Sequence, residues 1–158
     1  MNRWGSLLLV ACLTVGCAAD REPDIDRERA AILAVLNGET EAAFTRDYAA
    51  WEDHWVQEPY VTKTYINFAD STSSETLGWE DVSAFVRSYI AEHPEPDPLP
   101  QPLDDIDLRL YGKGAWVDYQ QVDPGRGYKR ESRLMEKVDG KWKIAGMQTV
   151  IYDSDRQP

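Results

Sequence analysis

The last third of the chain alternates apolar with polar residues and is divided by turn sequences, which predicts a run of antiparallel strands. Asp139-Gly140 is a dipeptide typical of a tight hairpin, and Gly112-Lys113-Gly114 marks an earlier turn. The expected strands are residues 106–111, 115–122, 131–138 and 141–152. A meander of this kind must bury one face, so the segments that precede it have to cover that face.

Three segments of the preceding half show the 3.6-residue period of amphipathic helices. They are residues 27–44, 47–56 and 79–92. Asp26 and Asp47 are suited to cap the first two, because a carboxylate at the N-cap accepts hydrogen bonds from free backbone N–H groups. In the second helix Tyr48, Trp51 and Trp55 are spaced to share one face.

One further strand and two irregular segments complete the order. Residues 60–68 alternate and are rich in Tyr, Val, Thr and Ile, which favours a strand, whereas residues 69–76 are small and polar and are expected to form a loop. Residues 92–105 carry proline at every second position from Pro94 to Pro102, which forbids a helix and favours extended geometry. That segment is either a stiff flap over a pocket or a rigid connection between helix and sheet. Helices gathered before a meander predict the α+β class.

The N-terminal segment has the features of an export signal. Arg3 precedes an uncharged apolar run over residues 4–15, which is too short to span a bilayer permanently. The sequence Leu13-Thr14-Val15-Gly16-Cys17 resembles a bacterial lipobox, which implies that Cys17 is the lipidated first residue of an exported lipoprotein on the cell membrane or on the outer membrane facing the periplasm. Leu9-Val10-Ala11-Cys12 also fits, but cleavage there leaves a very short apolar run. The expected divisions are a signal peptide at 1–16, a tether at 17–26, a domain at 27–152 and a tail at 153–158.

Composition excludes several classes of function. The 158 residues suffice for one domain, and a net charge of −11 repels a phosphate backbone, so nucleic-acid binding is not expected. With Cys12 removed and Cys17 lipidated, no thiol remains for a disulfide, a thiolate metal site or a cysteine nucleophile. His54 and His93 are the two histidines and lie far apart, so no metal is expected. The sequence has no glycine-rich phosphate loop, and no cofactor is expected.

The order and spacing of these segments resemble the nuclear transport factor 2-like superfamily, in particular its SnoaL-like branch. The residues that carry the resemblance are 31–36, 46–51, Trp55, 78–80, 114–117 and 131–144. The last block also resembles the association domain of calcium/calmodulin-dependent protein kinase II. The resemblance implies a cone-shaped curved antiparallel sheet wrapped around three helices of the N-terminal half, a pocket between sheet and long helix, and homodimers packed through the outer sheet face. Members include isomerases, cyclases, dehydratases and binding modules, so the fold alone does not give the function.

Two charged residues are the first candidates for a site in that pocket. In the association domain an arginine at the position of Arg133 faces the pocket and can pair with a ligand carboxylate, as a guanidinium can through two parallel hydrogen bonds. Arg133 is equally compatible with a salt bridge to a neighbouring residue. Asp118 lies on the preceding strand and is expected on the same inner face. There it would either orient a ligand and act as a base or form a closed ion pair with Arg133.

Further ligand-binding candidates are Trp116, Trp55, Tyr65 and Gln148. An aromatic pocket suits a flat or apolar ligand, although aromatic residues on one helix face commonly form plain core. The general base and the oxyanion-hole tyrosine of the isomerases align near Lys63 and Thr40, so steroid isomerase chemistry is not expected. Glu39 and Thr40 either point polar atoms into the cone or lie on the helix surface.

Three functions follow, in this order. The first is a lipid-anchored envelope domain that binds a small, anionic or aromatic molecule in a cone pocket without clear catalytic machinery. The second is a homodimeric assembly module, which a pocket filled by aromatic side chains would favour. The third is a SnoaL-like cyclase, isomerase or dehydratase with Asp118 as base, which an unpaired acid in a polar pocket would favour.

Overall fold

The structure, a computed structural model, describes residues 24–68, 70–123 and 127–152. The predicted signal peptide, lipidated Cys17 and C-terminal tail lie outside these residues and stay predictions. Within the described part of the chain, no helix is both long enough and apolar enough to cross a membrane.

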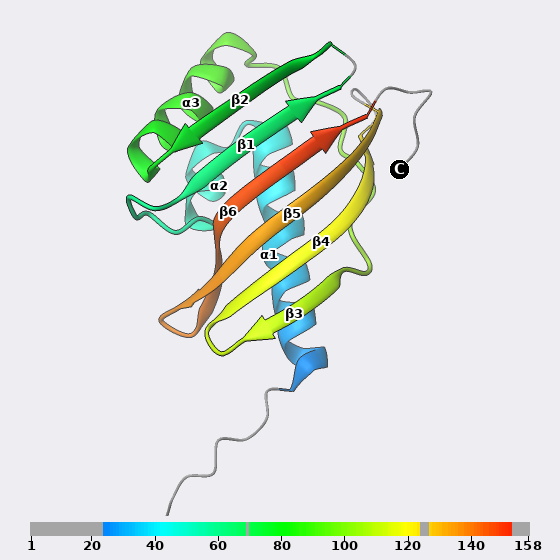
Figure 1. Cartoon of the computed structure of the whole chain (residues 1–158). Coiled ribbons are helices and arrows are strands. Elements are labelled where there is room, and N and C mark those ends of the chain that lie inside the picture. The colour runs from blue at the N-terminus through cyan, green and yellow to red at the C-terminus, as the bar shows by residue number, and fades with distance from the viewer. Residues whose placement is uncertain (1–23, 69, 124–126, 153–158) are drawn as a thin grey trace, which may run out of the picture.

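The described residues form an α+β fold, as the sequence predicts. Its elements in chain order are α1 (Ile25–Thr45), α2 (Tyr48–Asp53), β1 (Thr62–Asn67), β2 (Thr72–Leu77), α3 (Trp79–Glu92), β3 (Asp107–Tyr111), β4 (Gly114–Asp123), β5 (Gly127–Val138) and β6 (Lys141–Ile151). The strands make one sheet in the order β2-β1-β6-β5-β4-β3. Figure 1 shows this sheet curving across one side of the molecule, with α1 running behind it.

The helices begin and end close to the predicted residues. Helix α1 begins at Ile25, and its N-cap is Asp24, which accepts a hydrogen bond from the backbone N–H of Arg27 at 3.2 Å; the prediction of Asp26 was two positions late. Asp47 caps α2 as predicted. That helix is shorter than expected, because the chain turns after it and Trp55 forms an isolated bridge with Ile144 of β6.

The sheet differs from the prediction in two respects. Residues 69–76 are not all loop, because Thr72–Leu77 form β2, which pairs antiparallel with β1 at the edge of the sheet. The side chains of this strand are mostly exposed, so it lacks the alternation that identifies a half-buried strand. In addition, β1 pairs in parallel with β6, which makes the sheet mixed rather than antiparallel throughout.

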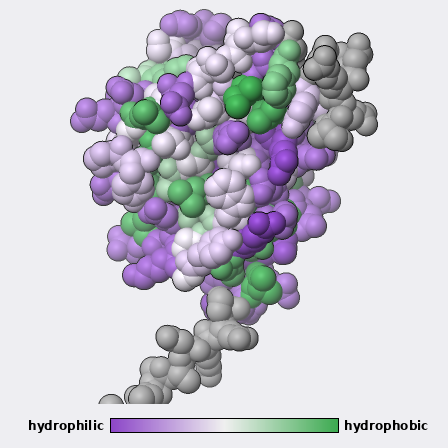
Figure 2. All heavy atoms as spheres, in the orientation of Figure 1, coloured by the Kyte–Doolittle hydropathy of each residue, from purple (hydrophilic) through white to green (hydrophobic). Residues whose placement is uncertain are grey.

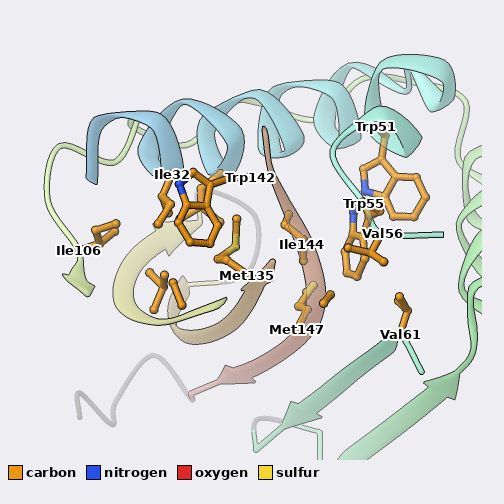
Figure 3. Close-up of a cluster of buried hydrophobic side chains, with 14 of the residues drawn as sticks. Ile32, Trp51, Trp55, Val56, Val61, Ile106, Met135, Trp142, Ile144 and Met147 are labelled. Carbon is orange, nitrogen blue, oxygen red and sulfur yellow. The ribbon is translucent and has the colours of Figure 1, made fainter. Parts of the chain in front are cut away.

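The hydrophobic core fills the space between α1 and the concave face of the sheet. Ile32 and Leu36 of α1 are fully buried, as are Met135 of β5 and Ile144 of β6. Figure 3 shows the core continuing toward α2, where Trp51 and Trp55 lie side by side, with ring centroids 5.3 Å apart. The N–H groups of both indoles donate hydrogen bonds to Glu39 of α1, so this end of the core carries a buried polar group.

The proline-rich segment runs alongside α1. The amide and carbonyl of Asn37 exchange hydrogen bonds of 3.0 and 2.8 Å with the backbone of Leu103. Nearer the C-terminal end of α1, Arg46 pairs with Asp97 at 2.7 Å, and the Asp97 N–H donates to the carbonyl of Phe44. These bonds at both ends favour the rigid connection over the flap.

We expect Met135→Ala to destabilise the fold by about 2–5 kcal/mol, because Met135 is fully buried and its truncation leaves a cavity. Val138→Ala is the control, since Val138 is an apolar residue of the same strand and is 37% exposed. It should cost less than about 1 kcal/mol. Denaturant unfolding of the two variants measures the difference, and equal losses would mean that the inward face of β5 is assigned incorrectly.

Candidate ligand site in the cone

The strand register brings one row of inward side chains together on the concave face. Lys63 of β1 lies beside Met147 of β6, which lies beside Arg133 of β5. All three side chains are buried. The next inward row consists of Tyr65, Thr149 and Glu131. Since neighbouring strands are about 4.8 Å apart, residues distant in sequence form one compact polar surface.

Arg133 contacts two carboxylates, Glu131 on its own strand β5 and Glu39 on α1. Its Nε donates to Oε2 of Glu131 at 2.9 Å, and its Nη2 also bonds Glu131. The same Nη2 lies 3.4 Å from Oε2 of Glu39 on α1. The other oxygen of Glu39 accepts from the indole N–H groups of Trp51 at 2.7 Å and Trp55 at 3.3 Å. Glu39 is therefore fixed by the helix, both tryptophans and Arg133.

Glu131 has two further partners. Lys129 Nζ lies 2.7 Å from its Oε1, and the hydroxyl of Tyr119 donates to Oε2 at 2.8 Å. Burial alone would raise the pKa of Glu131, but the charges of Arg133 and Lys129 and the hydrogen bonds outweigh it, so the pKa is lowered well below its usual value. Burial likewise opposes ionisation of Glu39, and Arg133, Lys63 and the Trp51 bond lower its pKa nonetheless. Both carboxylates are charged at neutral pH.

Two buried polar atoms of this surface have no hydrogen-bond partner among the described residues. They are Nη1 of Arg133 and Oγ1 of Thr149. Arg133 and Thr149 are only 3% and 2% exposed, so solvent does not satisfy these atoms freely. Unpaired buried donors and acceptors are costly, and each of them needs an explanation such as a missing partner.

These groups line two neighbouring chambers that share wall residues. The inner chamber has a volume of about 60 Å³ and includes Arg133, Glu131 and Thr149 in its wall. The outer chamber, of about 390 Å³, has a largely apolar wall made by Phe44, Trp51, Phe85, Val86, Tyr89 and Ile90. Lys63 and Tyr65 border both chambers. The site is thus a small charged recess at the end of a wider apolar opening.

The structure separates the two charged residues that the sequence analysis placed together. Arg133 faces the cone, but Asp118 lies on the outer face of β4, where it accepts hydrogen bonds from Trp116 and Ser132. The expectation that Asp118 and Arg133 share a face was wrong, because Val117 and Tyr119 are the buried residues of that strand. Burial opposes ionisation of Asp118, but the bonds from Ser132 and Trp116 lower its pKa, which makes it a weak base.

The other predicted site residues divide between the core, the cavity and the outer surface. Tyr65 borders the cavity as expected. Trp55 is fully buried and contributes its N–H to Glu39. Trp116 and Gln148 lie on the outer face of the sheet, away from the cone. Glu39 and Thr40, for which two orientations were open, both line the inner chamber.

Sequence reasoning missed Glu131, Lys129 and Thr149. A sequence signal was present for the first two. Lys129, Glu131 and Arg133 lie at every second position of β5 in step with the apolar Met135, and alternate residues of a strand share one face. Charged residues at the inward positions of a strand are unusual unless they are paired. Thr149 gives no such signal, since threonine is common on either face of a strand.

The two histidines lie at the ends of different helices, His54 after α2 and His93 after α3. Within residues 24–68, 70–123 and 127–152, no three His, Cys, Asp or Glu side chains are arranged to hold a metal ion. His54 instead packs on α1 at Gly38, where an added Cβ would lie 2.8 Å from its ring. Burial lowers the pKa of His54. The glycine allows the close approach of α2 to α1 next to Glu39.

Comparisons with known proteins agree with this geometry. The sequence matches the SnoaL-like domain family over residues 32–151. A cystatin-like fold protein from Burkholderia xenovorans has a TM-score of 0.62 at 18% identity, covering 87% of this chain and 96% of that chain. A nuclear transport factor 2-like protein of unknown function from Methylobacillus flagellatus has a TM-score of 0.61 at 16% identity, covering 84% and 97%. A similar protein from Silicibacter pomeroyi has 0.57 at 16% identity, covering 80% and 98%. A search of curated proteins finds no match. At these identities the solved structures establish the fold alone.

We expect Glu39→Gln to flatten the acid dependence of stability. The pKa of Glu39 is lowered in the folded protein, while an unfolded glutamate titrates near about 4.3. At a pH between the folded and unfolded pKa of Glu39, the unfolded state therefore binds more protons than the folded state. The contribution of Glu39 to the free energy of unfolding is complete above about pH 5 and is lost as the pH falls through the folded pKa.

Urea unfolding between pH 3 and pH 7 measures this effect. The change in unfolding free energy across that range should be smaller in Glu39→Gln than in the wild type. Glu41→Gln is the matched control, because Glu41 is exposed on the same helix, and its pH profile should follow the wild type. A wild-type profile in Glu39→Gln would show that the Glu39 carboxylate is not held in this way.

Proposed function

The chain belongs to the SnoaL-like domain family, and from that premise and the charge of its inner chamber we propose that it binds a small monocarboxylate. The carboxylate contacts Arg133 and Thr149, and the apolar body of the ligand occupies the outer chamber. The predicted lipid anchor at Cys17 would hold this site at an envelope membrane; Cys17 lies outside the described residues.

The balance of buried charge is the observation that carries the proposal. The cavity wall contains three buried cations, Lys63, Lys129 and Arg133, against two buried carboxylates, Glu39 and Glu131. With both carboxylates ionised, one positive charge remains uncompensated. An isolated charge in a low-dielectric interior is unfavourable, and a bound monoanion would neutralise it. A dianion such as phosphate fits less well, because it would add repulsion from the two carboxylates.

The unpaired atoms and the size of the chambers support the same ligand. Arg133 Nη1 and Thr149 Oγ1 lack partners among the described residues and can both donate to carboxylate oxygens. An inner chamber of about 60 Å³ has room for about two water molecules, or for a carboxyl group, but not for a ring. The outer chamber of about 390 Å³ is within the range of small-molecule pockets and is lined by aromatic and aliphatic side chains.

We expect wild-type protein to bind phenylacetate and Thr149→Val to bind it several-fold more weakly. Valine keeps the shape of threonine but removes a hydroxyl that has no partner in the described structure, so the variant should fold at least as well as the wild type. Arg133→Met should reduce the affinity by about tenfold or more, because it removes a charged donor. Isothermal titration calorimetry at pH 7 measures both changes.

Arg130→Met is the matched control for the arginine, since Arg130 is exposed on the outer face of the same strand. Its affinity for phenylacetate should equal that of the wild type. Loss of binding in Arg130→Met together with unchanged binding in Thr149→Val would contradict the proposed site. Circular dichroism of each variant separates a loss of contact from a loss of fold.

The outer face of the sheet favours a second candidate function, homodimeric assembly. Trp116 of β4 and Leu134 of β5 are paired across the strands and are 39% and 41% exposed. Figure 2 views this side of the molecule and shows hydrophobic patches separated by hydrophilic residues. Trp116 and Leu134 offer apolar area at the middle of this face that a second copy could cover.

We expect analytical ultracentrifugation to find a dimer for the wild type and a monomer for the double variant Trp116→Ser, Leu134→Ser, because the change removes apolar area from the centre of that face. Leu77→Ser is the control, since Leu77 is exposed on the edge strand β2. That variant should remain dimeric. A monomeric wild type would exclude assembly through this face.

A further inference from the structure

Lys63 occupies the boundary between the two chambers. It lies on β1, is 5% exposed, and borders both the charged recess and the apolar opening. A ligand with its carboxylate at Arg133 and its body in the outer chamber has to cross the boundary that Lys63 helps to form. This inference therefore rests on the proposed function and concerns the part of the ligand next to the carboxylate.

The hydrogen bonding of Lys63 leaves it with donors to offer. Its Nζ bonds the thioether sulfur of Met147 at 3.2 Å, which is a weak acceptor. No carboxylate of the described residues lies within 4.0 Å of Nζ, whereas Arg133 and Lys129 both have such partners. An ammonium group has three N–H donors, so its bonding capacity is largely unused.

Aromatic rings hold the ammonium in place as a cation. Nζ lies 5.1 Å from the ring centroid of Tyr65, 5.2 Å from Trp55 and 5.8 Å from Trp51. These distances are within the range of cation–π attraction, which positions the ammonium without using its N–H groups as conventional hydrogen bonds would. Lys63 is thus a positioned donor that acts on Glu39 through its charge and makes no ion pair within 4.0 Å among the described residues.

We infer that the site selects carboxylates with an oxygen on the adjacent carbon, that is, 2-oxo or 2-hydroxy acids, and that Lys63 donates a hydrogen bond to that oxygen. A second carboxylate is less suitable, because the first already neutralises the uncompensated positive charge of the cavity wall. A neutral oxo or hydroxyl oxygen accepts from Lys63 without adding charge. Lys63 acts here as a specificity-determining residue.

The experiment compares two acids that differ only at this carbon. Phenylglyoxylate has a carbonyl where phenylacetate has a methylene group. Isothermal titration calorimetry at pH 7 should give about tenfold tighter binding of phenylglyoxylate to the wild type, since a hydrogen bond from a charged donor contributes at least that factor. Lys63→Met keeps the length of the side chain and removes the donor, so the two acids should bind it with equal affinity.

Two further variants make the outcome specific. Lys63→Arg retains a charged donor and should keep a preference for phenylglyoxylate. Lys141→Met removes an exposed lysine and should behave as the wild type. Equal binding of both acids to the wild type, or an unchanged preference in Lys63→Met, would overturn the inference while leaving the proposed function standing. If neither acid binds the wild type, the proposed function fails and this inference fails with it.

Discussion

The buried pairing of Glu39 with Arg133 is the interaction on which the rest of the site depends. It connects the middle of α1 to the middle of β5, two elements that are distant in sequence, across the inside of the cone. Two indole N–H groups hold Glu39, and Glu131 holds the arginine, so neither charge can move without leaving another buried group unpaired. Such networks are costly when broken and contribute little net stability when intact, so their main effect is to fix the positions of the side chains. Here that geometry leaves Nη1 of Arg133 without a hydrogen-bond partner among the described residues.

Periodicity was sufficient to predict most of the strands and helices, whereas the inward orientation of Arg133 was expected only from the resemblance to the association domain. The prediction failed for Asp118 because β4 has apolar residues at both odd and even positions. Trp116 and Val117 are both apolar neighbours, so the pattern does not show which of them faces inward. On β5 the usual rule is reversed, since Lys129 and Glu131 point inward. A charged residue normally signals a solvated position unless it is paired. Lys129 and Glu131 pair with each other on one strand, whereas Glu39, which contacts Arg133, lies on another element, so no local pattern identifies that contact.

The sheet topology was also beyond local reasoning. The parallel pairing of β1 with β6 joins segments about eighty residues apart, and it is this pairing that sets Lys63 beside Met147 and Arg133. Strand β2 was missed because a polar edge strand buries almost nothing and leaves no periodic trace. The proline-rich segment, by contrast, was interpreted in two ways from sequence, and its hydrogen bonds to Asn37 and Arg46 favour one of them.

The contrast between a positive recess and a chain of net charge −11 has a consequence for kinetics. The proposed anionic ligand would meet a repulsive field at long range and an attractive one only inside the cone, within a Debye length of about 8–10 Å. Added salt screens the outer field more than the desolvated inner one. Arrival should therefore become faster as ionic strength rises, while residence time changes little. The surface charge would therefore set the association rate of the proposed ligand, and the buried charges of the cavity would set its dissociation rate.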